Sequence, residues 1–360
     1  MGVEEEFLLV DQVFRHTVPK APAVLGRIRS GGRVVLHAEL LASQVESSTG
    51  VCADLTGLRD DLVCGRGLLA AAARAEGTML LASGTPLLSG PDVRVTTGPR
   101  FDAIGSLYSG VVDDYEVCGC HVHVGVPDRD TAVGVINHLR PWLPTLLAIS
   151  VNSPFEGGRD TGYGSWRRMR QAVFPGSGLP PRFASAVEYD REVARLVDCG
   201  VLVDLAMSSW LARPSPRFPT VEVRAADTAM TVDGAILQAA LSRALIRTAL
   251  ADLERGREGP EIGSQVAAAA VWSAARYGLR GPGVDPLLAR TTPAEDLVSA
   301  LLVHVADALE DTGDGAVVQD LLKDVLESGT GAERQRSAAA GGPIAAVDYV
   351  AAQTSAEAWD

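Results

Sequence analysis

Lysine is nearly absent from this sequence. Of the 32 positively charged residues only Lys20 and Lys323 are lysines, and the rest are arginines. The phosphate-binding motif G-x-x-x-x-G-K-[ST] does not occur, and a Schiff-base lysine would have to be one of these two. If the protein uses ATP, arginines, backbone amides and metal ions must hold the phosphates.

Positive charge as a whole is also in deficit. The 360 residues carry a net charge of −13, with a pI near 5.0, which argues against a surface that binds nucleic acid or anionic lipid. The chain is 47% apolar and 21% charged, so it is not a disordered polymer. A chain of this length can bury a large core without disulfides, and one or two domains fit it equally well.

Cysteines, targeting signals and long apolar runs are scarce. The five cysteines form no C-x-x-C pair, which indicates a reduced protein rather than a disulfide framework. The acidic N-terminus lacks the basic region and apolar core of a signal peptide. The longest uncharged stretches, 77–91 and 141–155, are too short to span a bilayer. We therefore expect a cytoplasmic protein with no membrane partner.

Secondary structure changes character near residue 230, where short apolar or alternating runs give way to an Ala/Leu-rich part. The irregular spacing of the strands favours an α+β fold with a largely antiparallel sheet. The small, polar segment 328–342 is expected to be a loose surface segment. The predicted strands are Val3–Val10, Arg33–His37, Thr78–Ser83, Cys118–Gly125 and Thr220–Ala225. The predicted helices are Thr56–Ala75, Asp130–Ser150, Val187–Val197, Val232–Arg255, Gly263–Tyr277, Pro293–Glu310 and Val317–Glu327.

Three of the predicted strands carry two ionisable residues on one face and mostly apolar residues on the other, because side chains two apart point the same way. If the strands belong to one sheet, that face is costly unless metal ions or an anionic ligand neutralise it. Carboxylates with imidazole suit Mg²⁺ or Mn²⁺. The residues concerned are Glu4 and Glu6, His121 and His123, and Glu222 and Arg224.

Each of these pairs taken alone has a plainer interpretation. Glu-x-Glu is most often a solvated strand face, His-x-His also occurs in metal hydrolases, and Glu-x-Arg is usually a surface ion pair. A further acidic pair, Glu39 and Glu46, is spaced by seven and would share one face of a helix, although 44–46 could instead form a strand. Only the combination of pairs points to a site.

Several segments resemble the bacterial carboxylate–amine ligase family, also called type 2 glutamate–cysteine ligases. The match runs nearly from end to end, and its longest motif is the most specific. One departure is Ser83-Gly-Thr-Pro86, where we expect many members to have Gly-Thr-His-Pro. The matching segments are Gly2-Val-Glu-Glu-Glu6, Gln44-Val-Glu46, Cys118-Gly-Cys-His-Val-His-Val-Gly125, Asn152-Ser-Pro-Phe-Glu-Gly-Gly-Arg-Asp-Thr-Gly-Tyr-Gly-Ser-Trp-Arg167, Thr220-Val-Glu-Val-Arg-Ala-Ala-Asp-Thr228, Ala275-Arg-Tyr-Gly-Leu279 and Gly329-Thr-Gly-Ala-Glu-Arg-Gln-Arg336.

The resemblance implies the glutamine synthetase-like catalytic fold, a curved, largely antiparallel sheet that forms a funnel wrapped by helices. We expect one catalytic domain over 1–360, strand-rich in 1–230, helical in 231–327 and with a loose tail in 328–360. Because the first motif begins at residue 2, we also expect that a short leader is missing or the start codon is misplaced.

The resemblance also implies ATP, two or three Mg²⁺ ions and amide formation through an acyl phosphate. His123 would contact the nucleotide or its phosphates, and Arg224, with Arg159 or Arg167, would hold the γ-phosphate or the substrate carboxylate. Arg224 and Glu222 are the implied catalytic pair. The implied metal ligands are Glu4, Glu6, Glu39, Glu46, His121 and Glu222.

Two other functions remain open from the sequence. One is a metal-dependent hydrolase that uses His121 and His123, and the other is an inactive homologue that only binds ligand. Glutamate is the expected carboxylate donor because several arginines could hold its α-carboxylate. The sequence does not select cysteine over another amine. The apolar helices after residue 230 would suit a homodimer.

Overall fold

A seven-stranded sheet forms the centre of the computed structural model, which describes residues 1–28 and 32–355. The strand order is β10-β11-β5-β1-β3-β2, with β4 also paired to β1, and all these pairs are antiparallel. This confirms the predicted α+β class with a largely antiparallel sheet. The strands are β1 (Gly2–Asp11), β2 (Val35–Ala38), β3 (Gln44–Ser48), β4 (Thr78–Leu81), β5 (Gly119–Gly125), β10 (Ala212–Pro214) and β11 (Thr220–Asp227).

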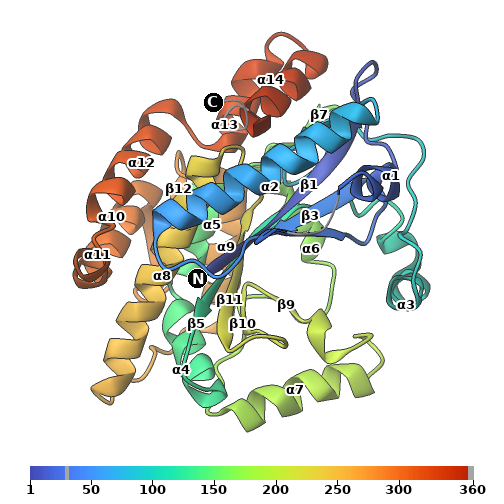
Figure 1. Cartoon of the computed structure of the whole chain (residues 1–360). Helices are drawn as coiled ribbons and strands as arrows, with labels where there is room; N and C mark the ends of the chain where they lie inside the picture. The colour runs from blue at the N-terminus through green and yellow to red at the C-terminus, as the bar shows by residue number, and fades with distance from the viewer. Residues whose placement is uncertain (29–31, 356–360) are drawn as a thin grey trace.

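One face of the sheet is apolar, and helices cover it. Val3, Val122 and Val223 pack in one core with residues of α2 (Leu55–Ala75), α4 (Arg129–Leu139), α5 (Leu143–Ser150) and α8 (Val232–Glu254). Figure 1 shows α2 lying along the sheet beside β1. The burial of these side chains stabilises the strands and leaves the opposite face for the ionisable residues.

Local sequence signals explain where the two long helices begin. The Asp54 side chain accepts a hydrogen bond from the Gly57 amide at the start of α2, and Thr231 caps α8 through the Gly234 amide. Such caps satisfy amides that have no partner within the helix. Both helices therefore start within one residue of their predicted positions.

Two predicted helices are each split in the structure. Asp130–Ser150 is α4 and α5, because Pro141 between them has no N–H to continue the helical hydrogen bonds. Pro293–Glu310 is α10 (Ala294–His304) and α11 (Ala306–Thr312). The second break falls at Val305, where neither proline nor glycine accounts for it.

The prediction of a loose tail was wrong for residues 328–355. Helices α13 (Gly331–Ala339) and α14 (Pro343–Ser355) occupy this segment, while 356–360 lie outside the described residues. Thr330 and Glu333 form a capping box at the start of α13. Val347 and Val350 of α14 are fully buried against Leu8 and Leu81 of the sheet. Small residues here allow close helix packing, which composition alone did not distinguish from a polar loop.

The remaining elements border the sheet and connect its strands. The other helices are α1 (Ala21–Gly26), α3 (Pro99–Tyr108), α6 (Trp166–Gln171), α7 (Ala186–Asp198), α9 (Ser264–Tyr277), α12 (Gly315–Ser328) and the 3-10 turns Ser109–Val111 and Leu205–Met207. Three small sheets pair β6 (Phe155–Glu156) with β7 (Arg159–Asp160), β8 (Ser177–Gly178) with β9 (Ser209–Trp210), and β12 (Pro282–Asp285) with β13 (Arg290–Pro293).

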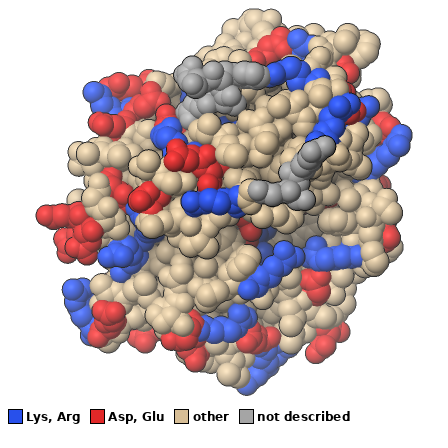
Figure 2. Space-filling model, viewed as in Figure 1, with Lys and Arg blue, Asp and Glu red and all other residues tan. Residues whose placement is uncertain are grey.

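Two surface properties bear on the predicted partners. Within the described residues, no helix is both long enough and apolar enough to cross a membrane. On the face shown in Figure 2, positively and negatively charged residues are interspersed. The expectation that the protein does not bind nucleic acid stays a prediction.

Candidate active site

Strand pairing brings the predicted ionisable residues onto one face of the sheet. Glu4 of β1 lies directly opposite His121 of β5, and His123 lies opposite Glu222 of β11. On the other side of β1, Glu6 lies opposite Glu46 of β3. Sequence alternation predicted the shared face, and the register of the sheet makes these residues neighbours.

Glu4, His123 and Glu222 form a first cluster, in which one possible ligand atom from each residue lies within 4.8 Å of the others. The Glu4 carboxylate is 3.4 Å from His123 Nε2 and 3.5 Å from His121 Nδ1. We call this group the imidazole cluster.

Glu6, Glu39 and Glu46 form a second cluster, with one carboxylate oxygen from each within 4.8 Å of the others. We call it the carboxylate cluster. The suggestion of a helix over 39–46 was wrong, and the alternative strand at 44–46 is confirmed as part of β3. Glu39 lies between β2 and β3, and the β2–β3 hairpin returns its carboxylate to Glu46. His121 connects the clusters, since its Nε2 is 3.9 Å from Glu6.

Electrostatics in the carboxylate cluster favour the uptake of positive charge. Burial, followed by the charge of Glu6, raises the pKa of Glu39 to about 7. Burial and the nearby Glu39 carboxylate raise the pKa of Glu46 well above its usual range. Three carboxylates this close and this shielded from water repel one another unless a proton or a cation neutralises them.

The protonation states of Glu4 and His121 favour the binding of a cation. Burial alone would raise the pKa of Glu4, but His121 and His123 hold that carboxyl ionised by lowering its pKa well below its usual range. Burial, followed by the charge of Arg224, lowers the pKa of His121, which favours neutral imidazole. The buried Nε2 atoms of His121 and His123 have no hydrogen-bond partner. Imidazole nitrogens without a hydrogen-bond partner, next to an ionised carboxylate, fit Mg²⁺ or Mn²⁺.

Arginines neutralise Glu222, which is only 2% exposed. Arg224 Nη1 donates a hydrogen bond to Glu222 Oε1, and Arg213 Nε of β10 donates to Oε2 at 2.7 Å. Although burial alone would raise it, the charges of Arg224 and Arg213 lower the pKa of Glu222 well below its usual range. Glu222 and Arg224 are therefore not a solvated surface pair, which excludes the plainer interpretation of this motif.

Arg167 is buried beside β5, on the face that carries His121, and is 1% exposed. Its Nη1 is 3.7 Å from Asp227, and its Nε and Nη1 have no hydrogen-bond partner. A Cβ on Gly119 would lie 2.2 Å from Arg167 Nη2, so only glycine leaves space for this guanidinium. The charge of Arg167 is thus buried beside Gly119 and His121, whereas Arg224 keeps 18% of its side chain exposed.

The other predicted residues lie at the margin. Arg159 is exposed in β7, the outer strand of a short hairpin, and its contact with a substrate stays a prediction. The unusual Gly84-Thr85-Pro86 segment is buried. A Cβ on Gly84 would lie 2.9 Å from the Asp227 carboxyl carbon, so this segment packs against the residues that support Arg167.

Sequence analysis missed three residues around the site. Arg66 of α2 forms a buried ion pair with Glu5, Arg213 binds Glu222, and Gln335 of α13 donates to the Asn152 side-chain oxygen at 2.8 Å. Each contact joins residues that are distant in the chain or lie in different elements. An isolated arginine or glutamine carries no local signal for such a contact, although the 329–336 motif had marked the region of Gln335.

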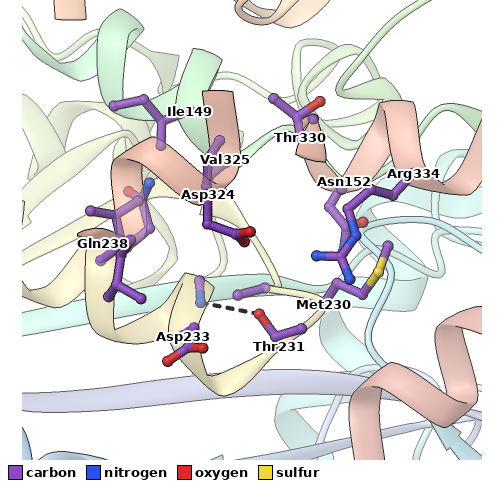
Figure 3. Close-up of a pocket in the computed structure, with 17 residues that line it drawn as sticks. Ile149, Asn152, Met230, Thr231, Asp233, Gln238, Asp324, Val325, Thr330 and Arg334 are labelled. Atoms are coloured by element: carbon purple, nitrogen blue, oxygen red, sulfur yellow. Dashed lines mark hydrogen bonds between the residues drawn. The ribbon is translucent and has the colours of Figure 1, made fainter. Parts of the chain in front are cut away.

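A cavity outside this face lies at the junction of α5, α8, α12 and α13 (Figure 3). Its volume is about 60 Å³, and the side chains of Asp324 and Arg334 point toward its centre. Arg334 is held by hydrogen bonds to Tyr349 and Gln353. Among the described residues, those lining this cavity do not include members of either cluster, so we assign it no part in the site.

A family model described as glutamate-cysteine ligase family 2 matches residues 1–352. The chain belongs to this family. A protein of Saccharopolyspora erythraea named "Putative glutamate–cysteine ligase 2-2" is 58% identical over 360 residues, covering 99% of this chain and 92% of that protein. A relative from Salinispora arenicola, "Putative glutamate–cysteine ligase 2", is 44% identical over 357 residues, which are 98% of this chain and 94% of that protein.

Solved structures with the same fold have low sequence identity. A glutamate–cysteine ligase from Francisella tularensis, solved in complex with AMP, has a TM-score of 0.74 at 13% identity, covering 98% of this chain and 88% of that one. A bifunctional glutathione synthetase from Pasteurella multocida has a TM-score of 0.70 at 16% identity, covering 99% of this chain and 52% of that one. These similarities confirm the predicted fold.

Family membership confirms the resemblance stated from the motifs. With it, the predicted class of enzyme is confirmed as an ATP-dependent ligase that forms a carbon–nitrogen bond. Neither the metal-dependent hydrolase nor the inactive homologue is favoured by these relatives. The identity of the two substrates and the roles of single residues remain proposals.

Proposed function

We propose that this member of the family phosphorylates the γ-carboxylate of glutamate with ATP and joins the resulting acyl phosphate to an amine. The observation that carries this proposal is the pair of adjoining clusters on one sheet face, with Arg224 beside them. A triphosphate needs several cationic partners, and this chain has no phosphate-loop lysine. Metal-binding carboxylates and arginine supply what that loop would otherwise provide.

The residues present fit divalent cations in both clusters. Glu4, His123 and Glu222 would hold one ion, and Glu6, Glu39 and Glu46 would hold another, with His121 between them. When bound, Mg²⁺ would neutralise phosphate charge during phosphoryl transfer. His123 would also lie against the nucleotide phosphates.

Arg224 has the position expected of a residue that stabilises the reacting group. Its exposed part faces the side of the sheet that carries both clusters, and its bond to Glu222 holds it there. Burial alone would lower the pKa of Arg224, but the Glu222 carboxylate raises it, so the guanidinium stays charged. A fixed positive charge at this place would stabilise negative charge on the transferred phosphoryl group and on the tetrahedral oxyanion. A deprotonated amine is itself nucleophilic, so the reaction does not require a catalytic triad.

The proposed donor is glutamate, and the amine is proposed to be cysteine by analogy with the names of the relatives. Arg159 and Arg167 remain candidates to hold the carboxylate or the γ-phosphate. We also propose that the protein works in the cytoplasm, where its five free cysteines would stay reduced, and that the apolar helices after residue 230 allow a homodimer.

The test is to incubate the protein with Mg²⁺, ATP, glutamate and a panel of amines, and to detect amide products by mass spectrometry. ADP and phosphate should form, and hydroxylamine should trap a γ-glutamyl hydroxamate. EDTA should abolish both activity and tight ATP binding. Recovery of AMP and pyrophosphate would refute an acyl phosphate, and equal ATP affinity with and without EDTA would refute the metal assignment.

A further inference from the structure

Arg213 is a second cationic partner of Glu222 beside Arg224, and nothing in the sequence motifs points to it. It lies in the edge strand β10, directly opposite Glu222 of β11. Its Nε is 2.7 Å from Glu222 Oε2, and its Nη2 is 3.1 Å from Oε1. Two parallel hydrogen bonds of this kind fix both the position and the plane of a carboxylate.

The rest of the Arg213 guanidinium is held by the backbone. Its Nη1 donates to the carbonyl oxygens of Ala206 and Ser208, the latter at 2.8 Å. Four hydrogen bonds therefore use four of the five N–H groups that an arginine offers. With 12% of its side chain exposed and its donors occupied in this way, Arg213 is poorly placed to bind a substrate anion.

Arg224 contacts the same carboxylate differently. Its Nη1 donates to Glu222 Oε1 and lies 3.4 Å from His121 Nδ1. Glu222 Oε1 thus accepts a hydrogen bond from each of the two arginines. Of these two arginines, Arg213 alone donates to Oε2. A carboxylate oxygen has two lone pairs, so Oε2, which accepts one hydrogen bond from Arg213, retains one lone pair.

We propose that Arg213 is a positioning residue that orients Glu222 so that one oxygen remains available to a divalent cation. The proposal builds on the metal role assigned to Glu222 in the proposed function. It separates the two arginines: Arg213 governs how tightly the metal binds, and Arg224 faces the reacting group. Arg213 would act through Glu222 and would not touch the substrate.

The first test is Arg213→Lys, which keeps the charge but loses the planar fork. Calorimetry with Mn²⁺ alone should show that the ion binds at least tenfold more weakly to the imidazole cluster, to which Glu222 belongs. In steady-state assays the metal concentration for half-maximal rate should rise by a similar factor, while kcat at saturating metal stays within about threefold of wild type, as expected for a loss of ground-state binding. Arg217→Lys is the matched control, because Arg217 is exposed in the turn between the same two strands.

The second test is a double-mutant cycle with Glu222→Gln. If Arg213 acts through Glu222, Arg213→Lys should have little further effect on Mn²⁺ binding in the Glu222→Gln background. Three results would each overturn the proposal. The first is an undiminished effect of Arg213→Lys in the Glu222→Gln background, and the second is an unchanged Mn²⁺ affinity in Arg213→Lys alone. The third is tighter Mn²⁺ binding in Arg213→Lys, which would mark Arg213 as a competitor of the metal. If the melting curve of Arg213→Lys shows that this variant is unfolded, Arg213→Gln, which keeps a planar donor, replaces it.

The Mn²⁺ measurement needs neither ATP nor glutamate, so it separates the two proposals. A wild-type protein that binds Mn²⁺ but forms no amide would refute the proposed substrates and leave the role of Arg213 intact. A wild-type protein that forms the amide, together with an Arg213→Lys variant of normal metal affinity, would refute only the role of Arg213.

Discussion

The buried ion pair between Glu5 and Arg66 should be among the most sensitive points of the fold. Glu5 lies on the core side of β1, between the site residues Glu4 and Glu6, and its side chain is 1% exposed. Arg66 of α2 donates to both of its oxygens, at 2.6 and 3.0 Å, and to the carbonyl oxygens of Ala229 and Met230. One guanidinium thus ties the central strand to α2 and to the segment that enters α8.

Arg66→Met should lower the free energy of unfolding by about 3–5 kcal/mol, because it leaves a buried carboxylate without a partner. The double variant Glu5→Leu with Arg66→Met removes that charge and should recover part of the loss. It should not exceed wild type, because two buried carbonyl groups would still lack their donor, at a cost of about 1–3 kcal/mol each.

Urea unfolding followed by both circular dichroism and tryptophan fluorescence is the appropriate assay, since coincident curves are needed to derive a free energy. The control is Arg195→Met, which breaks an exposed pair with Glu192 on α7 and should cost less than about 1 kcal/mol. If Arg66→Met cost no more than this control, the buried pair would not stabilise the fold as argued.

Further predictions concern the site itself. Arg224→Lys should lower kcat more than it raises KM for ATP, with a rise of about 2–4 kcal/mol in the barrier, and wild-type kcat would show that another arginine faces the reacting phosphate. For the metal-free protein, the pKa of Glu39 is raised from 4.5 to about 7, so its contribution to stability is present below pH 4.5 and is lost as the pH rises through 7. That 2.5-unit difference corresponds to at most about 3 kcal/mol, and melting curves across pH 4–8 with EDTA should show the decline. Because burial and Glu39 also raise the pKa of Glu46, Glu46→Gln should remove the contribution of Glu46 to this pH dependence while weakening Mn²⁺ binding; an equally steep decline would contradict a raised pKa at Glu46.

Much of the site could be predicted because alternation along a strand is a local property. Glu4 with Glu6, His121 with His123, and Glu222 with Arg224 each share a face as soon as their segments are extended. Their apolar neighbours, such as Val122 and Val223, give the direction of the core. The same local patterns located the long helices and, together with the longer motifs, the family.

Local patterns failed where the deciding contact was distant in the chain. The 331–339 segment is poor in large apolar residues, and it is ordered because Gln335 is fully buried against Asn152 and because α14 packs on the sheet. Glu39 reaches the carboxylate cluster through a hairpin rather than a helix. In each case tertiary contacts outweighed a weak local preference.

The sequence by itself therefore determined which residues would share a face, the class of fold and the family. Only the tertiary structure decided that β1 lies between β5 and β3, which separates the ionisable face into an imidazole cluster and a carboxylate cluster. It also decided that Glu5 would bind Arg66 and that Glu222 would bind Arg213. The physical reason is that side-chain alternation follows from the geometry of one strand, whereas strand order and the partner of a buried charge follow from packing between segments far apart in the chain.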